Sequence, residues 1–389
     1  MCTDALHLPI CPCCSCLCII APSLVCSPLT PTTLDRPSQE EEELIREWVP
    51  QPLVPALSAR LRKAPRRLVI TDTADAHNRL EDGREVVNFA SYNFLGLAAS
   101  ATIKQACEAT IRKYGVGSCG PRGFYGTIDT HLDCEKRICA FLGTDEAILY
   151  SDGLACVSSV IPAFSKAGDL IICDEDANYH VQQGVLLSRS EVKYFKHNDM
   201  ADLERVLQEV AAADATHKRK LNRRFIVVEG IYYNHGDLVD LPRVGALKQQ
   251  YKYRLVLDDS MAFGVLGATG RGTPQHFGVP IADVEIYCAT LDATLATCGG
   301  FCAGTHEVCN HQRLSGAGYC FSAASPPYSS TAAIEGFNLI DAEPQRLAAL
   351  AANASAAHKA LKQLGMWMWG RCIMYLCLGL FFLLCSFIL

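Results

Sequence analysis

The chain has 389 residues, of which 50% are hydrophobic and 20% are charged, and its formal net charge is −6. Such a chain can bury a sizeable core, so it is expected to be a folded globular protein and not a disordered one. The net negative charge excludes a general nucleic-acid binder, because neutralising phosphates takes clustered Lys and Arg.

The first 85 residues predict two segments of different character. Residues 1–38 are rich in Cys, Pro, Ser and Thr and have no basic region before their short apolar stretch, so they predict a disordered leader and not a signal peptide. In the segment 39–85, EEEELIREW predicts a helix with an acidic first turn. PQPLVP at 50–55 predicts an extended arm that packs on a neighbouring chain.

The 21 cysteines fall into two groups. Those in the body of the chain stand in apolar or Gly-rich runs at irregular spacing, which is typical of reduced, buried thiols. Seven others crowd into the first 26 residues, where CPCCSCLC at 11–18 offers thiolates for a metal or for S-acylation. No folded context accompanies that motif, so no metal site is expected.

Residues 86–342 predict the folded body, in which strands and helices alternate. VVNFASYNFLGLA at 86–98 predicts a strand and a turn, followed by a helix that ends at Tyr114. A later helix, with Asn198 or Asp199 as its N-cap, has an apolar face made of Leu203, Val206, Leu207 and Val210. The strands are predicted at 146–153, 169–176, 191–199, 223–230, 255–257 and from Val284 onward. This alternation predicts an α/β fold with a mostly parallel sheet and helices on both faces.

Acidic residues follow several of these predicted strands, namely Asp152, Asp174 to Asp176, Glu229, Asp258 and Asp259. Ligands of such sheets bind at the carboxyl ends of the strands, so the sequence predicts a site at that edge. His197 and His235 fall in predicted loops and receive no role.

The segment GVGSCGPRGFYGT at 115–127 is a Gly-rich loop. It follows a predicted helix and not a hydrophobic strand, so it is not a dinucleotide-binding fingerprint. Its glycines would let the backbone approach a ligand or a neighbour closely. An ordinary flexible loop is the alternative.

The stretch 253–304 carries the layout of a pyridoxal phosphate (PLP) enzyme. In such an enzyme an Asp at a strand end pairs with the pyridinium nitrogen, and a Lys on a following segment holds the cofactor as a Schiff base. Asp258 ends the apolar run 255–257, but no lysine occurs between Lys252 and Lys359. Asp258 is therefore either the remnant of a cofactor site or a plain carboxylate hydrogen-bonded to a helix N-terminus.

The C-terminal part predicts a connecting helix at 343–365 and a hydrophobic tail at 366–389. Residues 372–389 carry no charge and are long enough for a short membrane span. Trp367, Trp369 and Arg371 would be its interfacial anchors.

A family pattern is carried by several stretches, including NFASYNFLGL, KYGVGSCGPRGFYGTIDTHLD, FKHNDMADLERVL, RRFIVVEGIYYNHG, FGVLGATGRG and HQRLSGAGYCFSAASPP. On these stretches, residues 40–365 resemble the α-oxoamine synthase family, fold-type I PLP enzymes that condense an amino acid with an acyl-CoA and release carbon dioxide. Within that family the match is closest to the long-chain-base subunit 1 branch of serine palmitoyltransferase. The resemblance implies a fold-type I PLP-transferase large domain, with the C-terminal small domain missing.

The resemblance also implies how the cofactor residues have changed. Catalytic members have Asp-Glu-Ala-His where this chain has Asp258-Asp259-Ser260-Met261, so the pyridinium-pairing acid is kept and the His is lost. Asn178 stands where those members have a His that stacks on the cofactor ring. The Schiff-base Lys aligns with Ala293, which implies that this chain has no catalytic residue of its own.

Two further features are expected to contribute to a shared site. Gly153 precedes a predicted helix and could cradle a phosphate through backbone N–H groups, although a plain strand-to-helix turn is the alternative. The resemblance implies that the loop 117–127, with Arg122, Gly120, Gly123 and Tyr125, faces a catalytic subunit, where the planar fork of Arg122 would suit phosphate or carboxylate.

The function implied is that of a non-catalytic subunit of serine C-palmitoyltransferase, which makes 3-oxosphinganine from L-serine and palmitoyl-CoA. PLP would be bound covalently by the catalytic partner in a heterodimer at the endoplasmic reticulum membrane, with the folded domain facing the cytosol. One alternative is a truncated interaction protein that forms inactive complexes with the catalytic subunit. Another is that both chain ends arise from splicing, because the composition changes abruptly after Gly365. A self-sufficient PLP synthase is the least favoured interpretation.

Overall fold

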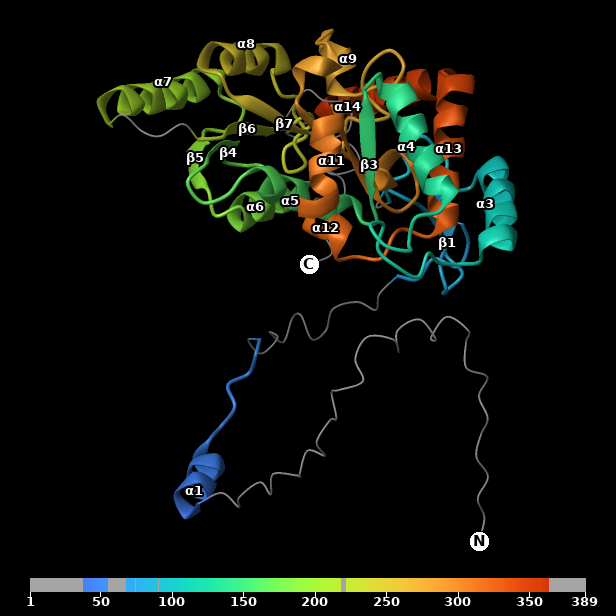
Figure 1. Cartoon of the computed structure of the whole chain (residues 1–389). Coiled ribbons are helices and arrows are strands. Elements are labelled where there is room, and N and C mark those ends of the chain that lie inside the picture. Colours follow the sequence, from blue (N-terminus) through green and yellow to red (C-terminus); the bar gives the residue numbers. More distant parts are fainter. Residues whose placement is uncertain (1–37, 55–67, 74, 90, 218–221, 364–389) are drawn as a thin grey trace, which may run out of the picture. The chain divides into compact units, whose positions relative to one another are not determined.

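The computed structural model describes residues 38–54, 68–73, 75–89, 91–217 and 222–363 (Figure 1). The chain divides into two compact units, Met1–Pro65 and Arg66–Leu389. The predicted leader at 1–38, apart from Ser38, and the hydrophobic tail at 366–389 lie outside the described residues. Within the described part, no helix is both long enough and apolar enough to cross a membrane.

The first unit contains one described helix, α1 (Gln39–Glu47). Ser38 starts it with a capping box, in which the Ser38 hydroxyl accepts from the Glu41 amide at 3.2 Å and the Glu41 carboxylate accepts from the Ser38 amide at 2.7 Å. The predicted helix is therefore confirmed. Its apolar side chains Leu44, Ile45 and Trp48 are all exposed, and the role of the following arm as a packing segment stays a prediction.

The second unit is built on a seven-stranded sheet in the order β3-β9-β8-β7-β6-β4-β5. All neighbouring pairs are parallel except those of β9, which runs antiparallel to β3 and to β8. The strands are β3 (Glu146–Tyr150), β4 (Leu170–Asp174), β5 (Glu191–Phe195), β6 (Arg224–Glu229), β7 (Arg254–Asp258), β8 (Ile286–Thr290) and β9 (Gly300–Gly304). A separate antiparallel pair is formed by β1 (His77–Arg79) and β2 (Glu85–Val87). The predicted mostly parallel sheet is confirmed.

The described helices of this unit include the three that the sequence predicts, which are the helix ending at Tyr114, the helix after Asn198 or Asp199 and the connecting helix at 343–365. The described helices are α3 (Ala101–Tyr114), α4 (Asp129–Leu142), α5 (Gly153–Phe164), α6 (Tyr179–Leu187), α7 (Met200–His217), α8 (Leu241–Tyr251), α9 (Thr273–Phe277), α10 (Asp292–Leu295), α11 (His306–Ser315), α12 (Ala317–Cys320), α13 (Pro327–Ala342) and α14 (Gln345–Gln363), with a 3₁₀ turn at Ile281–Asp283. In α7, Asp199 is the cap, because its carboxylate accepts from the amides of Ala201 and Asp202. The four predicted apolar residues of that helix are all buried.

Helices cover both faces of the sheet because strand side chains alternate between the faces. Ile226 and Leu255 belong to the larger buried cluster, together with residues of α4, α7, α8 and α13. Phe225 and Val256 point the other way, into a second cluster with α5 and α6. Figure 1 shows α7 and α8 on one side of β6 and β7 and α5 and α6 on the other. Each parallel strand therefore ends, at its carboxyl end, in a loop that leads to a covering helix.

Candidate functional site

The carboxyl edge of the sheet contains a cavity of about 180 Å³. Its lining includes the residues that the sequence singles out for a vestigial cofactor site, Gly153, Asn178, Asp258 and Ala293. These residues come from four separate segments of the chain, and the parallel strands bring them to one edge. The cavity is smaller than the roughly 300–1,000 Å³ of typical small-molecule sites.

Two carboxylates, Asp258 and Glu229, stand buried at the ends of the paired strands β7 and β6. Asn178 connects them: its side-chain amide donates to Asp258 at 3.0 Å, and its backbone N–H donates to Glu229 at 2.6 Å. Asp258 also accepts from the Ser260 hydroxyl at 2.5 Å, and Glu229 accepts from the Tyr233 amide at 2.9 Å. Asp258 is therefore held by side chains and by a turn, and not by a helix N-terminus alone.

Burial raises the pKa of both carboxyl groups. For Glu229, loss of solvent and then the neighbouring charge of Asp258 raise the pKa to about 8. For Asp258, burial raises the pKa while the hydrogen bonds from Ser260 and Asn178 oppose the rise. The pair resembles a carboxylate dyad in which one proton is retained near neutral pH.

Asp259, the next residue along the chain, points away from this pair. Its carboxylate accepts from the Thr273 hydroxyl at 2.5 Å, from the Thr273 amide at 2.9 Å and from the Tyr287 hydroxyl at 2.7 Å. Burial raises its pKa to about 6 against these hydrogen bonds. Asp259 is thus a structural anchor for α9, whereas Asp258 belongs to the cavity.

The residues around the cavity do not fit a covalently held PLP. Ala293 is fully buried in α10 at the position that the resemblance assigns to the Schiff-base lysine, and no lysine of the described residues lines the cavity. At the start of α5, the Asp152 carboxylate already accepts from the Ala155 amide at 2.7 Å, which puts a negative charge where a phosphate would bind. The described residues around this cavity therefore offer no amine that could hold PLP as a Schiff base.

Gly153 has a packing reason to be a glycine. A Cβ atom at this position would lie 2.1 Å from the Thr290 hydroxyl oxygen and 2.8 Å from the Gly299 carbonyl oxygen. The start of α5 is therefore pressed against β8 and the segment before β9. This contact favours the plain strand-to-helix turn over the phosphate cradle.

The Gly-rich loop differs from the expectation at Arg122, and this is a correction. Its guanidinium is buried and pairs with the buried Glu135 at 2.9 Å, while its Nε donates to the Thr127 hydroxyl at 3.1 Å. A buried Glu needs such a partner, so the planar fork of Arg122 is not free to meet a phosphate or carboxylate of another subunit. The buried contacts of Arg122 with Glu135 and Thr127 therefore hold the loop in place.

The outer side of that loop is apolar and exposed. Phe124 is 76% exposed and Tyr125 is 97% exposed, and Gly123 between Arg122 and Phe124 has open space around it. Gly120 lies against Gly126, where a Cβ atom on Gly126 would be 1.7 Å from the Gly120 carbonyl oxygen. The glycines thus serve a tight turn that pushes two aromatic rings outward. Leu154 and Tyr179, which line the cavity, are exposed as well.

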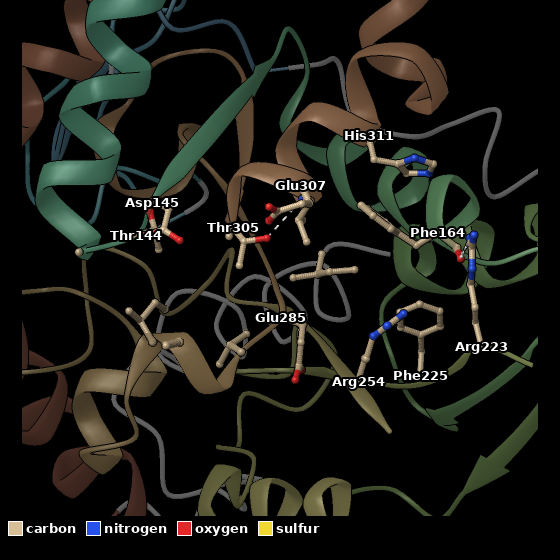
Figure 2. A pocket seen from close by; sticks show the side chains of 17 residues that line it. Thr144, Asp145, Phe164, Arg223, Phe225, Arg254, Glu285, Thr305, Glu307 and His311 are labelled. Carbon is tan, nitrogen blue, oxygen red and sulfur yellow. Dashed lines mark hydrogen bonds between the residues drawn. The ribbon is translucent and has the colours of Figure 1, made fainter. Parts of the chain in front are cut away.

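A larger pocket, of about 610 Å³, lies at the opposite edge of the sheet (Figure 2). Its polar groups are used in local contacts: Arg223 donates to the Phe164 carbonyl, His311 contacts the Ala163 carbonyl, and Glu285 pairs with Lys248. Figure 2 shows these labelled side chains spread around the rim, without a common point. The arrangement offers no catalytic constellation.

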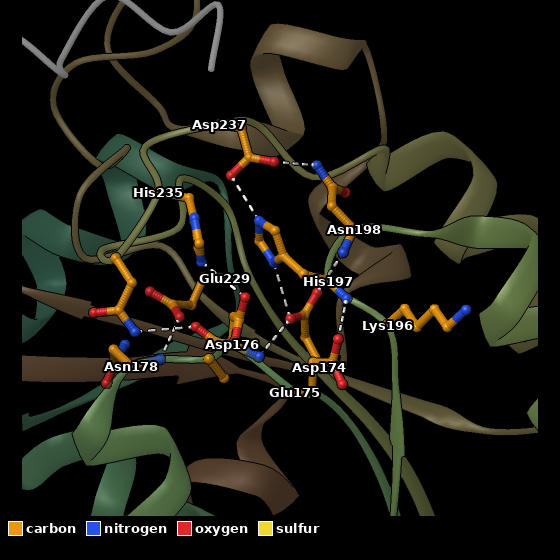
Figure 3. A network of polar contacts seen from close by, with 12 residues as sticks. Asp174, Glu175, Asp176, Asn178, Lys196, His197, Asn198, Glu229, His235 and Asp237 are labelled. Carbon is orange, nitrogen blue, oxygen red and sulfur yellow. Dashed lines mark hydrogen bonds and ion pairs between the residues drawn. The ribbon is translucent and has the colours of Figure 1, made fainter. Parts of the chain in front are cut away.

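Sequence reasoning missed one cluster beside the cavity, formed by Asp174, Asp176, His197, His235 and Asp237 (Figure 3). The two imidazole rings stack with centroids 4.2 Å apart; His197 contacts Asp174 and Asp237, and His235 contacts Asp176. A signal was present, since these residues stand at or just after the carboxyl ends of β4, β5 and β6. Only the strand order, in which β4 lies between β5 and β6, brings the three loops together.

Comparison with known proteins identifies relatives of this chain. The family of class I and II aminotransferases matches residues 84–381. Long chain base biosynthesis protein 1b of Oryza sativa subsp. japonica is 48% identical over 327 residues, 83% of this chain and 66% of the relative. Serine palmitoyltransferase 1 of Dictyostelium discoideum is 44% identical over 326 residues, 84% of this chain and 67% of the relative. The chain thus spans about two thirds of the length of these relatives.

Solved structures agree with the fold. Sphingomonas wittichii serine palmitoyltransferase has a TM-score of 0.73 at 26% identity, covering 79% of this chain and 75% of that one. The 8-amino-7-oxononanoate synthase of Francisella tularensis has a TM-score of 0.62 at 20% identity, with 73% and 78% covered. The predicted fold class, an α/β fold-type I large domain, is confirmed.

Proposed function

Since the chain belongs to the class I and II aminotransferase family, in the branch of the serine palmitoyltransferase subunits, we propose that it is a non-catalytic subunit of serine palmitoyltransferase. In this proposal a catalytic partner binds PLP covalently and condenses L-serine with palmitoyl-CoA to 3-oxosphinganine. The observation that carries the proposal is Ala293, buried at the lysine position of a cavity that no described lysine lines.

The residues of this chain support a part in assembly. PLP, when bound by the partner, would supply the electron sink for the condensation. Asn178 fixes the two buried carboxylates of this chain through hydrogen bonds, so the cavity wall keeps one shape. Phe124, Tyr125 and Tyr179 present exposed apolar surface at the same edge, and such surface is typical of protein–protein interfaces.

The proposal includes a location at the endoplasmic reticulum membrane with the folded unit in the cytosol. This part rests on the family resemblance alone. Fractionation of cells that express the full chain, followed by protease protection of the sealed membranes, tests it. The expected result is a membrane-bound chain whose folded unit is digested from the cytosolic side, whereas recovery in the soluble fraction contradicts it.

The central experiment is co-expression of the chain with a catalytic subunit in cells that lack their own first subunit. The readouts are co-purification and formation of 3-oxosphinganine in membranes. A double variant, Phe124→Ser with Tyr125→Ser, removes the exposed rings of the loop. Tyr194→Ser on the edge strand β5 is the matched control, because Tyr194 is half exposed at the other end of the sheet.

The outcomes separate two functions. If the double variant lowers the activity and Tyr194→Ser leaves it unchanged, the result supports a subunit that is required for activity. Co-purification without activity favours the alternative, a regulatory chain that forms inactive complexes, which the inward-facing Arg122 also favours. Absence of co-purification overturns both.

A further inference from the structure

The cluster beside the cavity gathers two imidazoles and several carboxylates from three loops. Asp174 ends β4 and Asp176 follows it, His197 follows β5, and His235 and Asp237 follow β6. Strands β5 and β6 both pair with β4, so the three loops leave the same edge of the sheet side by side. Figure 3 shows the side chains converging from these loops.

Three of these residues have the spacing of metal ligands. Asp176, His197 and His235 each offer one ligand atom, and the three atoms lie within 4.8 Å of one another. The His235 Nε2 atom is 2.9 Å from an oxygen of Asp176. Bonds of about 2.0–2.1 Å in a tetrahedral zinc site put ligand atoms about 3.3 Å apart, so this pair needs little movement to accept an ion.

The surroundings of His197 place a carboxylate at each ring nitrogen, and a metal ion would replace one of these two contacts. Its Nδ1 atom lies 3.0 Å from Asp174, and its Nε2 atom lies 3.1 Å from Asp237. Whichever nitrogen turns to a metal, the other keeps an aspartate. Carboxylates that hold the second nitrogen of a ligand His fix its orientation and raise its basicity.

The charge of the cluster also favours a cation. Asp174 is fully buried, and Asp176 and Asp237 add two further carboxylates against two histidines. A divalent ion would offer two positive charges to these three carboxylates, the buried Asp174 included.

We propose that Asp176, His197 and His235 bind one divalent transition-metal ion of the Zn²⁺ class. Two imidazoles and one carboxylate form a ligand set that suits such ions, and water completes the coordination. The ion has a structural role, because Asp176 lies two residues before Asn178, and Asn234, which lines the cavity, precedes His235. The Asn234 side chain already donates to the Asp176 carbonyl at 3.1 Å. The site is independent of the proposed function and departs from the expectation of no metal.

The test is titration of the full chain with Co²⁺, followed by visible absorption. Co²⁺ reports its ligands: nitrogen and oxygen ligands give only weak d–d bands, whereas the cysteines of the leader would add intense thiolate charge-transfer bands. The variants are His235→Gln and, as a second route should that variant unfold, Asp176→Asn. His276→Gln is the matched control, since His276 is a histidine on α9 that is not one of the three proposed ligands. Circular dichroism establishes that each variant is folded.

The expected result is one equivalent of Co²⁺ bound with bands of nitrogen and oxygen ligands. We expect its affinity to fall by about 10–100-fold in His235→Gln and in Asp176→Asn, and to stay unchanged in His276→Gln. Binding seen only through thiolate bands overturns the proposal. So does an equal affinity in wild type and in both ligand variants, or the absence of any bound equivalent.

Discussion

At the carboxyl edge of the sheet, Glu229, Asp258 and Asp259 are buried and their pKa values are raised. At the amino edge, the charged groups around the larger pocket are partly or fully exposed, and the N-terminal turn of α11 lowers the pKa of Glu307. Burying a carboxylate costs free energy that a solvated one does not lose. The carboxylates at the carboxyl edge therefore cost the folded state free energy that the solvated groups around the larger pocket do not.

The largest effect on the free energy of unfolding is expected from removal of a buried carboxylate at the carboxyl edge, compared with removal of an exposed one at the amino edge. Asp259→Ala leaves the Thr273 amide, the Thr273 hydroxyl and the Tyr287 hydroxyl without their acceptor, which should lower the free energy of unfolding by about 3–5 kcal/mol. Glu307→Ala at the amino edge should stay within error of wild type. Urea unfolding of both variants measures the difference, and equal losses would remove the contrast between the edges.

The second effect concerns pH. The folded chain keeps a proton on Glu229 up to about pH 8, whereas the unfolded chain loses it near the ordinary pKa of 4.5. The folded state thus binds more protons between these values, and its stability falls as pH rises from 4.5 to 8. Glu229→Gln cannot titrate, so it should gain a few kcal/mol relative to wild type between pH 5 and pH 8.5, at about 1.4 kcal/mol per unit of pKa difference.

The control for this measurement is Glu307→Gln at the amino edge. The pKa of Glu307 is already lowered, so its carboxylate is ionised throughout the same pH range. Its stability relative to wild type should not change with pH. If the difference in free energy of unfolding between Glu229→Gln and wild type stays constant from pH 5 to pH 8.5, Glu229 is ionised in the folded protein.

A smaller effect is expected from Gly153→Ala, because the added Cβ must push against Thr290 and the Gly299 carbonyl. Overpacking of this kind costs about 1–3 kcal/mol. Gly245→Ala on α8 is the matched control, since a Cβ atom there meets open space and Ala is the better helix former. Thermal unfolding should show a lower midpoint for the first variant and an equal or higher one for the second.

The sequence predicts the features that depend on local pattern. The apolar spacing of Leu203, Val206, Leu207 and Val210 is enough to place α7, and the run before Asp258 is enough to place β7. Chain order also brings Asp258, Glu229 and Gly153 to one edge, because parallel strands share that edge. These predictions needed no knowledge of which strands are neighbours.

The features that the sequence misses depend on side-chain direction and on strand order. Asp258 and Asp259 are adjacent in the sequence, yet one faces the cavity and the other anchors Thr273. Arg122 turns inward because Glu135, thirteen residues later, is buried and needs a counter-charge. His197 and His235 meet only because β4 separates β5 from β6 in the sheet.

The smallest effect should come from Arg254→Ala at the amino edge. Arg254 begins β7 on the rim of the larger pocket and is exposed, so its charge is solvated whether or not the pocket is empty. The free energy of unfolding should change by less than about 0.5 kcal/mol, and activity with the catalytic partner should stay at the wild-type level. Urea unfolding and the membrane assay measure the two quantities on the same preparation. Unchanged stability with lost activity would show that the amino edge acts in the complex, and the contrast between the edges would then describe only the isolated chain.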